Sequence, residues 1–191
     1  MRPFLCSSMI LSLAGCAAVP AGPPEEVAPK IVALLEAGKS DEADELFEAA
    51  SDQEGAADQL YPLLYEQARG RYERGEAEGS AGILHFMARQ YPKSRAVREA
   101  LVYALFLERA GTEPPAPELV REMGTAIASL RTAAAEVPAW VELVQAQQAI
   151  DRGDLGAARE AFARFQGTRK KTAPELTVYV EDIDRYLRSH P

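Results

Sequence analysis

Apolar side chains recur at intervals of three and four residues along almost all of residues 25–191, with polar side chains between them. This spacing is typical of α-helices that bury one face and leave the other in water. Runs of β-branched residues are missing, and strict apolar–polar alternation, the pattern of a half-buried strand, never persists. The pattern therefore predicts an all-α domain.

The helical pattern contains an internal repeat that is marked by glycine. Segments that begin at Gly38, Gly75 and Gly153 align with one another, and a further helical pattern precedes each glycine. A small residue lies five positions after each glycine, and a large apolar residue lies nine positions after it. The small residues are Ala43, Ser80 and Ala158, and the large ones are Phe47, Leu84 and Phe162. A small residue lets two helices approach closely, and the large one fills the layer between neighbouring pairs.

These features resemble the tetratricopeptide repeat, in which helix A, a glycine turn and helix B form one unit. In that family a small residue, an aromatic residue, a second small residue and a proline follow the glycine. The copy that begins at Gly38 fits four of these places. The second copy ends in Pro92 but has Met87 at the later small position, and the last copy departs at Phe165 and Lys170. The resemblance implies a right-handed α-solenoid of about four helix pairs.

The spacing of the glycines leaves room for one further pair between the second and the last copy. Residues 94–111 and 117–138 supply two amphipathic helices there, joined by a connection longer than is usual in the family. Residues 173–189 contain a final amphipathic stretch, which we expect to cap the open end of the stack, as solenoids require. A helical bundle without repeats is the alternative that the sequence leaves open.

A different pattern precedes the helical domain. Arg2 is followed by an apolar stretch from Phe4 to Leu13 and then by small residues. This stretch is too short for a permanent membrane span and is typical of a secretory signal peptide. Residues 13–16, Leu-Ala-Gly-Cys, resemble the bacterial lipobox, which implies cleavage before Cys16 and attachment of lipid to its sulfur. The alternative is an ordinary cleaved signal peptide that leaves Cys16 as a stray thiol.

The chain therefore divides into a signal peptide (1–15), an acylated Cys16 with a proline-rich tether (16–24) and a TPR-like helical domain (25–191). Each buried methylene contributes about 0.8 kcal/mol, so two or three acyl chains anchor a protein firmly. Aspartate after the acylated cysteine is a signal for retention in the inner membrane, and this chain has Ala17 instead. We expect an outer-membrane location facing the periplasm, with the inner membrane as the alternative.

Charge and cysteine content narrow the choice of partners. The formal net charge is -8, and an acidic surface repels both nucleic-acid phosphates and anionic lipid headgroups. Contact with a membrane is therefore expected only through the lipid anchor. The two cysteines are Cys6, inside the signal peptide, and Cys16, so the mature chain has no thiol for a disulfide or a metal site.

Motifs for catalysis are not found in the sequence. His85 lies within an apolar helical stretch and His190 lies near the end of the chain, and neither belongs to a metal-binding or nucleophile motif. A glycine-rich phosphate loop is also missing. We therefore expect a binding module with no cofactor, no metal and no small-molecule substrate, rather than an enzyme.

The resemblance implies that partners bind in a concave groove lined by the A helices. Counting back from Gly75 puts Tyr65, Arg69 and Tyr72 on one face of the second helix A. The same count assigns Arg98 and Arg109 to the third. Tyrosine and arginine are enriched at binding hot spots, and arginine recognises carboxylates, which indicates an acidic or C-terminal peptide segment as partner. The alternative is that both tyrosines pack between helices while Arg69 lies in water.

Together these features predict a membrane-anchored periplasmic scaffold or adaptor for other envelope proteins. Relatives with a lipid anchor act in outer-membrane protein assembly, in pilus or secretion machinery and in cell-wall machinery, and the sequence does not choose among them. A permanent structural subunit of an envelope complex is the second hypothesis. Such a subunit would expose a large apolar patch, whereas a transient binder would keep a groove of mixed polar and aromatic residues.

The lipobox resemblance generates a prediction about Cys16. Metabolic labelling with a clickable fatty acid should mark the wild-type chain, and Cys16→Ser should remove the label and release the protein from membranes. A wild-type chain that takes up no label would show that the lipobox interpretation is wrong.

Overall fold

The computed structural model describes residues 22–168 and 176–190, and in these ranges the chain forms nine α-helices and no strand. The helices are α1 (Pro24–Glu36), α2 (Ser40–Ser51), α3 (Ala56–Glu73), α4 (Ala77–Gln90), α5 (Arg95–Ala110), α6 (Pro117–Ala133), α7 (Trp140–Asp151), α8 (Leu155–Thr168) and α9 (Thr177–Ser189). The all-α prediction is confirmed. The signal peptide, Cys16 and most of the tether (16–24) lie outside the described residues.

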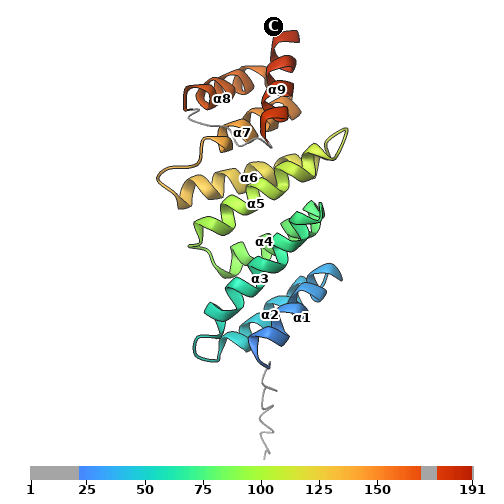
Figure 1. Ribbon diagram of the computed structural model, residues 1–191, viewed down its shortest axis with the longest axis vertical. Helices are drawn as coiled ribbons and strands as arrows, with labels where there is room; N and C mark the ends of the chain where they lie inside the picture. The colour runs from blue at the N-terminus through green and yellow to red at the C-terminus, as the bar shows by residue number, and fades with distance from the viewer. Residues whose placement is uncertain (1–21, 169–175, 191) are drawn as a thin grey trace, which may run out of the picture.

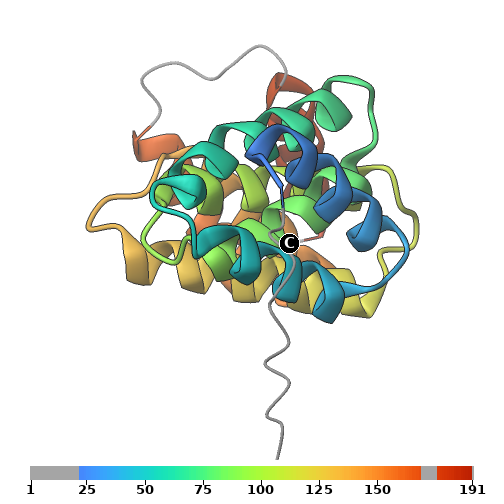
Figure 2. The same cartoon turned by 90° about the horizontal axis from the view of Figure 1, so that it is seen from below.

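The helices form an elongated stack that begins with α1 and α2 and ends with α8 and α9 (Figure 1). From α1 to α8, each helix packs against the next one in the chain, and α1 also packs against α3. Viewed along the stack, α3 lies on one side and α6 on the opposite side (Figure 2). One continuous core of buried apolar side chains follows the stack from α1 to α9.

The three glycines of the sequence repeat lie at turns between consecutive helices. Gly38 lies between α1 and α2, Gly75 between α3 and α4, and Gly153 between α7 and α8. Their φ angles are 71°, 79° and 75°, in the left-handed region that glycine enters without steric cost. Each turn lets the following helix pack back against the preceding one.

The small and large positions of the repeat are all buried. Ala43 and Ala158 are fully buried, and Ser80 is 2% exposed. The large apolar residues Phe47, Leu84 and Phe162 are buried in the same core. The packing therefore agrees with the roles that their spacing predicts.

The boundaries of the third pair differ from the expected ones at a single end. Helix α5 matches the predicted 94–111 closely, whereas α6 stops at Ala133 instead of continuing to residue 138. Ala134 has extended backbone angles, with φ of -134° and ψ of 129°. Pro138 further disfavours helical geometry in the residue before it, so the chain runs irregularly until α7 begins.

Helix α9 packs across the last pair, against both α7 and α8 (Figure 1). Its buried face consists of Val180, Ile183 and Leu187. On a neighbouring face, the ring of Tyr179 meets the ring of Phe106 in α5 at 4.8 Å between centroids. The C-terminal helix therefore packs on the last pair and also contacts the preceding pair.

The burial of the small positions generates a prediction about stability. Ala43→Leu and Ala158→Leu should each destabilise the fold by about 1–3 kcal/mol, because extra methylenes force the paired helices apart. Ala37 is exposed beside the first glycine turn, so Ala37→Leu is the matched control. Urea unfolding followed by circular dichroism measures the difference. Equal midpoints for all three variants would contradict close packing at the small positions.

Candidate functional site

A cleft between α3 and α5, in the described part of the chain, extends to the start of α7. Its volume is about 350 Å³. Small and apolar side chains form its floor, four aromatic rings line it, and Arg69 and Glu99 are its charged residues. The buried residues Ala68, Ser80, Leu84 and Ala104 form the floor, Ala96 and Ala100 are more exposed, and the rings are those of Tyr65, Tyr72, Tyr103 and Trp140.

Helical periodicity explains why these side chains share one surface. Helix α3 buries Leu60, Leu64 and Ala68 against the core. Tyr65 and Tyr72 are seven residues apart, which is two helical turns, and therefore lie on one face beside the buried one. In α5 the lining positions Ala96 and Tyr103 have the same separation. Alanine on the α5 side of the cleft leaves the space that larger residues would fill.

Three of the rings form a row that joins three consecutive helix pairs. The centroids of Tyr72 in α3 and Tyr103 in α5 are 5.8 Å apart. Those of Tyr103 and Trp140, the first residue of α7, are 5.5 Å apart, with the planes at 78°. Both distances lie in the range of favourable aromatic pairs. Tyr72 is 36% exposed, so the row presents ring surface to solvent.

Tyr65 belongs to a second aromatic group, which a hydrogen bond from Tyr91 to the backbone holds in place. Its ring stacks on Tyr61 at 6.1 Å, and Tyr61 meets Tyr91 edge-on at 5.0 Å. The hydroxyl of Tyr91 donates a 2.7 Å hydrogen bond to the carbonyl of Ala57. Burial, followed by the neighbouring Tyr61, raises the pKa of Tyr65, so its phenol stays neutral. This group fixes one wall of the cleft.

Arg69 is exposed and already has partners on its own helix. Its side chain is 59% exposed, and its Nε donates a 2.8 Å hydrogen bond to Glu73. Glu66 lies 3.7 Å from Nη1. The hydrogen bond to Glu73 raises the pKa of the guanidinium. Across the cleft, Glu99 is paired with Arg95 at 2.5 Å.

The structure thus brings Tyr65, Arg69 and Tyr72 together at one cleft, whereas Arg98 and Arg109 lie elsewhere. Arg98 donates a 2.8 Å hydrogen bond to the carbonyl of Pro92, at the start of α5. The α5 residues that line the cleft instead include Ala96, Glu99, Ala100 and Tyr103. The helical register of the third pair is therefore shifted from the one used to choose the two arginines.

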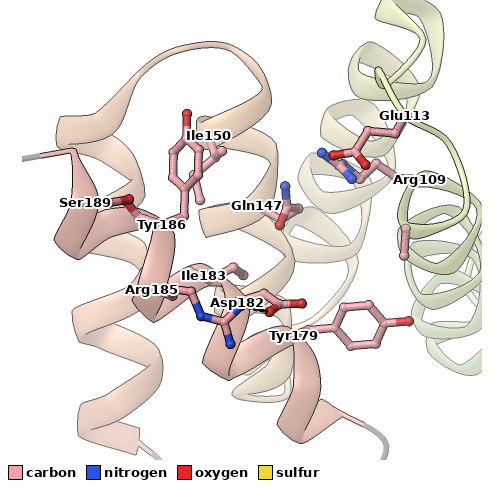
Figure 3. Close-up of a pocket in the computed structure, with 11 residues that line it drawn as sticks. Arg109, Glu113, Gln147, Ile150, Tyr179, Asp182, Ile183, Arg185, Tyr186 and Ser189 are labelled. Carbon is pink, nitrogen blue, oxygen red and sulfur yellow. Dashed lines mark hydrogen bonds and ion pairs between the residues drawn. The ribbon is translucent and has the colours of Figure 1, made fainter.

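Arg109 lies beside a second hollow of about 500 Å³, between the C-terminal ends of α5 and α7 and helix α9 (Figure 3). Its Nε and Nη2 donate hydrogen bonds of 2.7 and 2.5 Å to the two carboxylate oxygens of Asp151. The Asp151 side chain is 1% exposed and also accepts a 2.9 Å hydrogen bond from Gln147. Arg109 is therefore a link between α5 and α7, and its charge is used within the fold.

Two residues of the cleft, Tyr103 and Trp140, are not among the site residues that the sequence predicts. Tyr103 could have been found by extending the seven-residue spacing of Tyr65 and Tyr72 to α5, starting at Ala96. Trp140 is the single tryptophan of the chain and follows closely after Pro138, a signal for a helix start. Its approach to Tyr103 depends on how α5 and α7 pack, which the sequence pattern does not specify.

Of the two histidines that the sequence singles out, His190 stacks on the ring of Tyr186 near the end of α9, and His85 lies in α4. Its Nε2 lies 2.7 Å from a carboxylate oxygen of Glu122, which joins α4 to α6. Burial lowers the pKa of His85, Glu122 raises it and Arg89 lowers it further. The pair lines neither of the two hollows. Over residues 22–168 and 176–190, no group of three or more His, Cys, Asp or Glu side chains is arranged to hold a metal ion.

None of the helices in the described ranges is long and apolar enough to cross a membrane. Comparison of the chain with models of known protein families, with curated proteins and with solved structures finds no match. The residues of the cleft and the sequence patterns are therefore what indicates the function of the chain.

The placement of the two arginines generates a prediction that separates their roles. Arg109→Ala leaves the buried Asp151 carboxylate without its cation, which should cost about 3 kcal/mol of stability, the usual cost of breaking a buried ion pair. Arg69→Ala removes an exposed pair and should leave the urea midpoint unchanged. Unfolding curves of the two variants test this. A midpoint for Arg109→Ala equal to that of the wild type would contradict the structural role.

Proposed function

We propose that this chain is a lipid-anchored periplasmic scaffold or adaptor whose helical stack holds a segment of another envelope protein in the ring-lined cleft. The observation that carries the proposal is the row of Tyr72, Tyr103 and Trp140, which spans three consecutive helix pairs. We further propose that the stack is a right-handed α-solenoid of TPR-like helix pairs, anchored through Cys16 and facing the periplasm from the outer membrane.

The order of the helices supports the solenoid part of the proposal. The cleft is lined by α3, α5 and α7, which are the first helices of consecutive pairs, with α4 adding to its floor. A groove lined by the first helix of each pair is the binding surface that the tetratricopeptide resemblance implies. Pairs that contact mainly their neighbours form extended surfaces of this kind.

The surface of the stack supports a reversible partner over a permanent one. In the part of the chain that the structure describes, Tyr72, Val178 and Tyr186 are the exposed large hydrophobic residues, at 36%, 61% and 38%. Tyr72 lines the cleft, while the other two lie on α9. A permanent subunit would need a larger contiguous apolar patch than these separated residues supply.

The proposal predicts that Arg69→Ala combined with Tyr72→Ala removes the partner without unfolding the stack. The protein is purified from detergent-solubilised membranes, and partners are identified by mass spectrometry. A partner recovered with the wild type should be lost with this double variant, because the exposed ring and the exposed guanidinium at the rim of the cleft are both gone.

A matched control is available on α9. Arg185 and Tyr186 have similar exposure and lie beside the second hollow, so Arg185→Ala with Tyr186→Ala should keep the partner. Both double variants should retain the wild-type melting temperature. Recovery of the partner with the cleft variant, or its loss with the control alone, would locate the site away from the cleft.

A further inference from the structure

The charges around the cleft determine what kind of segment it accepts. Among the described residues, the charged side chains that line the cleft are Arg69 and Glu99, and their printed ion-pair partners bring the set to three carboxylates and two guanidinium groups. The carboxylates are those of Glu66, Glu73 and Glu99, and the guanidinium groups are those of Arg69 and Arg95. One net negative charge is left, on a chain whose formal charge is already -8.

An acidic segment would have to displace partners that are already in place. Arg69 donates to Glu73 at 2.8 Å and lies 3.7 Å from Glu66, so a third carboxylate would compete with two on the same helix. Glu99 would face the incoming carboxylate from the other wall of the cleft. Like charges in such proximity disfavour binding.

The lining of the cleft favours the binding of a cation. The faces and edges of Tyr65, Tyr72, Tyr103 and Trp140 surround a cleft that also contains the Glu99 carboxylate, whose side chain is 27% exposed. Aromatic faces attract the guanidinium of arginine and the ammonium of lysine, most strongly in partly desolvated sites. The floor of alanines leaves room for the aliphatic part of such a side chain.

We infer that the cleft selects a cationic partner segment, in which an arginine or lysine side chain lies against the exposed ring surface and pairs with Glu99, sharing this carboxylate with Arg95, which donates to its Oε1. This inference rests on the proposed function and specifies the chemistry of its partner. The cleft volume of about 350 Å³ is at the lower end of the range for ligand sites, which fits one or two side chains of a protein segment. The negative field of the whole chain also favours the approach of a cation.

The experiment selects peptides without assuming their sequence. A random peptide library is panned against the purified full-length chain, and the best peptide is resynthesised with each arginine replaced by citrulline, its neutral isostere. Binding is followed by the fluorescence of Trp140, the single tryptophan of the chain, which lines the cleft. We expect the selected peptides to be rich in arginine and lysine, and citrulline to weaken binding by about tenfold.

A matched pair of charge variants separates the cleft from the general field. Glu99→Gln and Glu48→Gln remove one negative charge each, and Glu48 is exposed on α2, away from the cleft. Glu99→Gln should weaken the arginine peptide by about tenfold and Glu48→Gln by less than about twofold. Equal losses would show that the acidic surface, and not the cleft, attracts the peptide.

The inference about charge and the proposed function can fail independently of each other. Peptides rich in aspartate and glutamate, peptides without charge bias, or no binding peptide at all would overturn the choice of a cation. The proposed function is judged separately by the partner that co-purifies. If the cleft variant loses that partner while the peptides show no preference for cations, the cleft binds proteins and the inference about charge is wrong.

Discussion

Close approach of two helices through a small residue is the constraint on which the rest of the structure depends. Ala43, Ser80 and Ala158 are buried in the second helix of a pair, where a larger side chain would separate it from the first. Ser80 and Leu84, the two positions that the repeat marks in the second pair, also form part of the floor of the cleft. The packing that holds the pair together therefore also sets the depth of the site.

The site depends equally on the alignment of neighbouring pairs. The row of rings is contributed by α3, α5 and α7, and its geometry holds only if these helices keep their spacing. The buried ion pair between Arg109 and Asp151 fixes α5 against α7 at the far end of these two helices. This ion pair, away from the cleft, and the apolar packing below the cleft thus act on the same helices.

The sequence predicts most of the fold because helix formation depends on local spacing and on glycine at turns. The helix pairs around Gly38, Gly75 and Gly153 follow directly from these signals, and Tyr65, Arg69 and Tyr72 share a face because they lie on one helix. Arg98 and Arg109 were assigned to α5, which is followed by Gly111 with a φ of -84° rather than a positive φ, and by a longer connection to α6. The count from the glycine therefore does not transfer to this helix. The contribution of Trp140 depends on packing between helices far apart in sequence, which periodicity does not encode.

Helix α9 also affects which apolar surface is available for association between copies of the chain. Its apolar face, with Val180, Ile183 and Leu187, lies against the last pair at the point where another pair would otherwise add. A stack of similar units without such a cover has an end that matches the beginning of the next molecule, and head-to-tail contacts of this kind continue into filaments. With α9 in place, the apolar side chains that it covers on α7 and α8 are out of reach of a second copy of the chain.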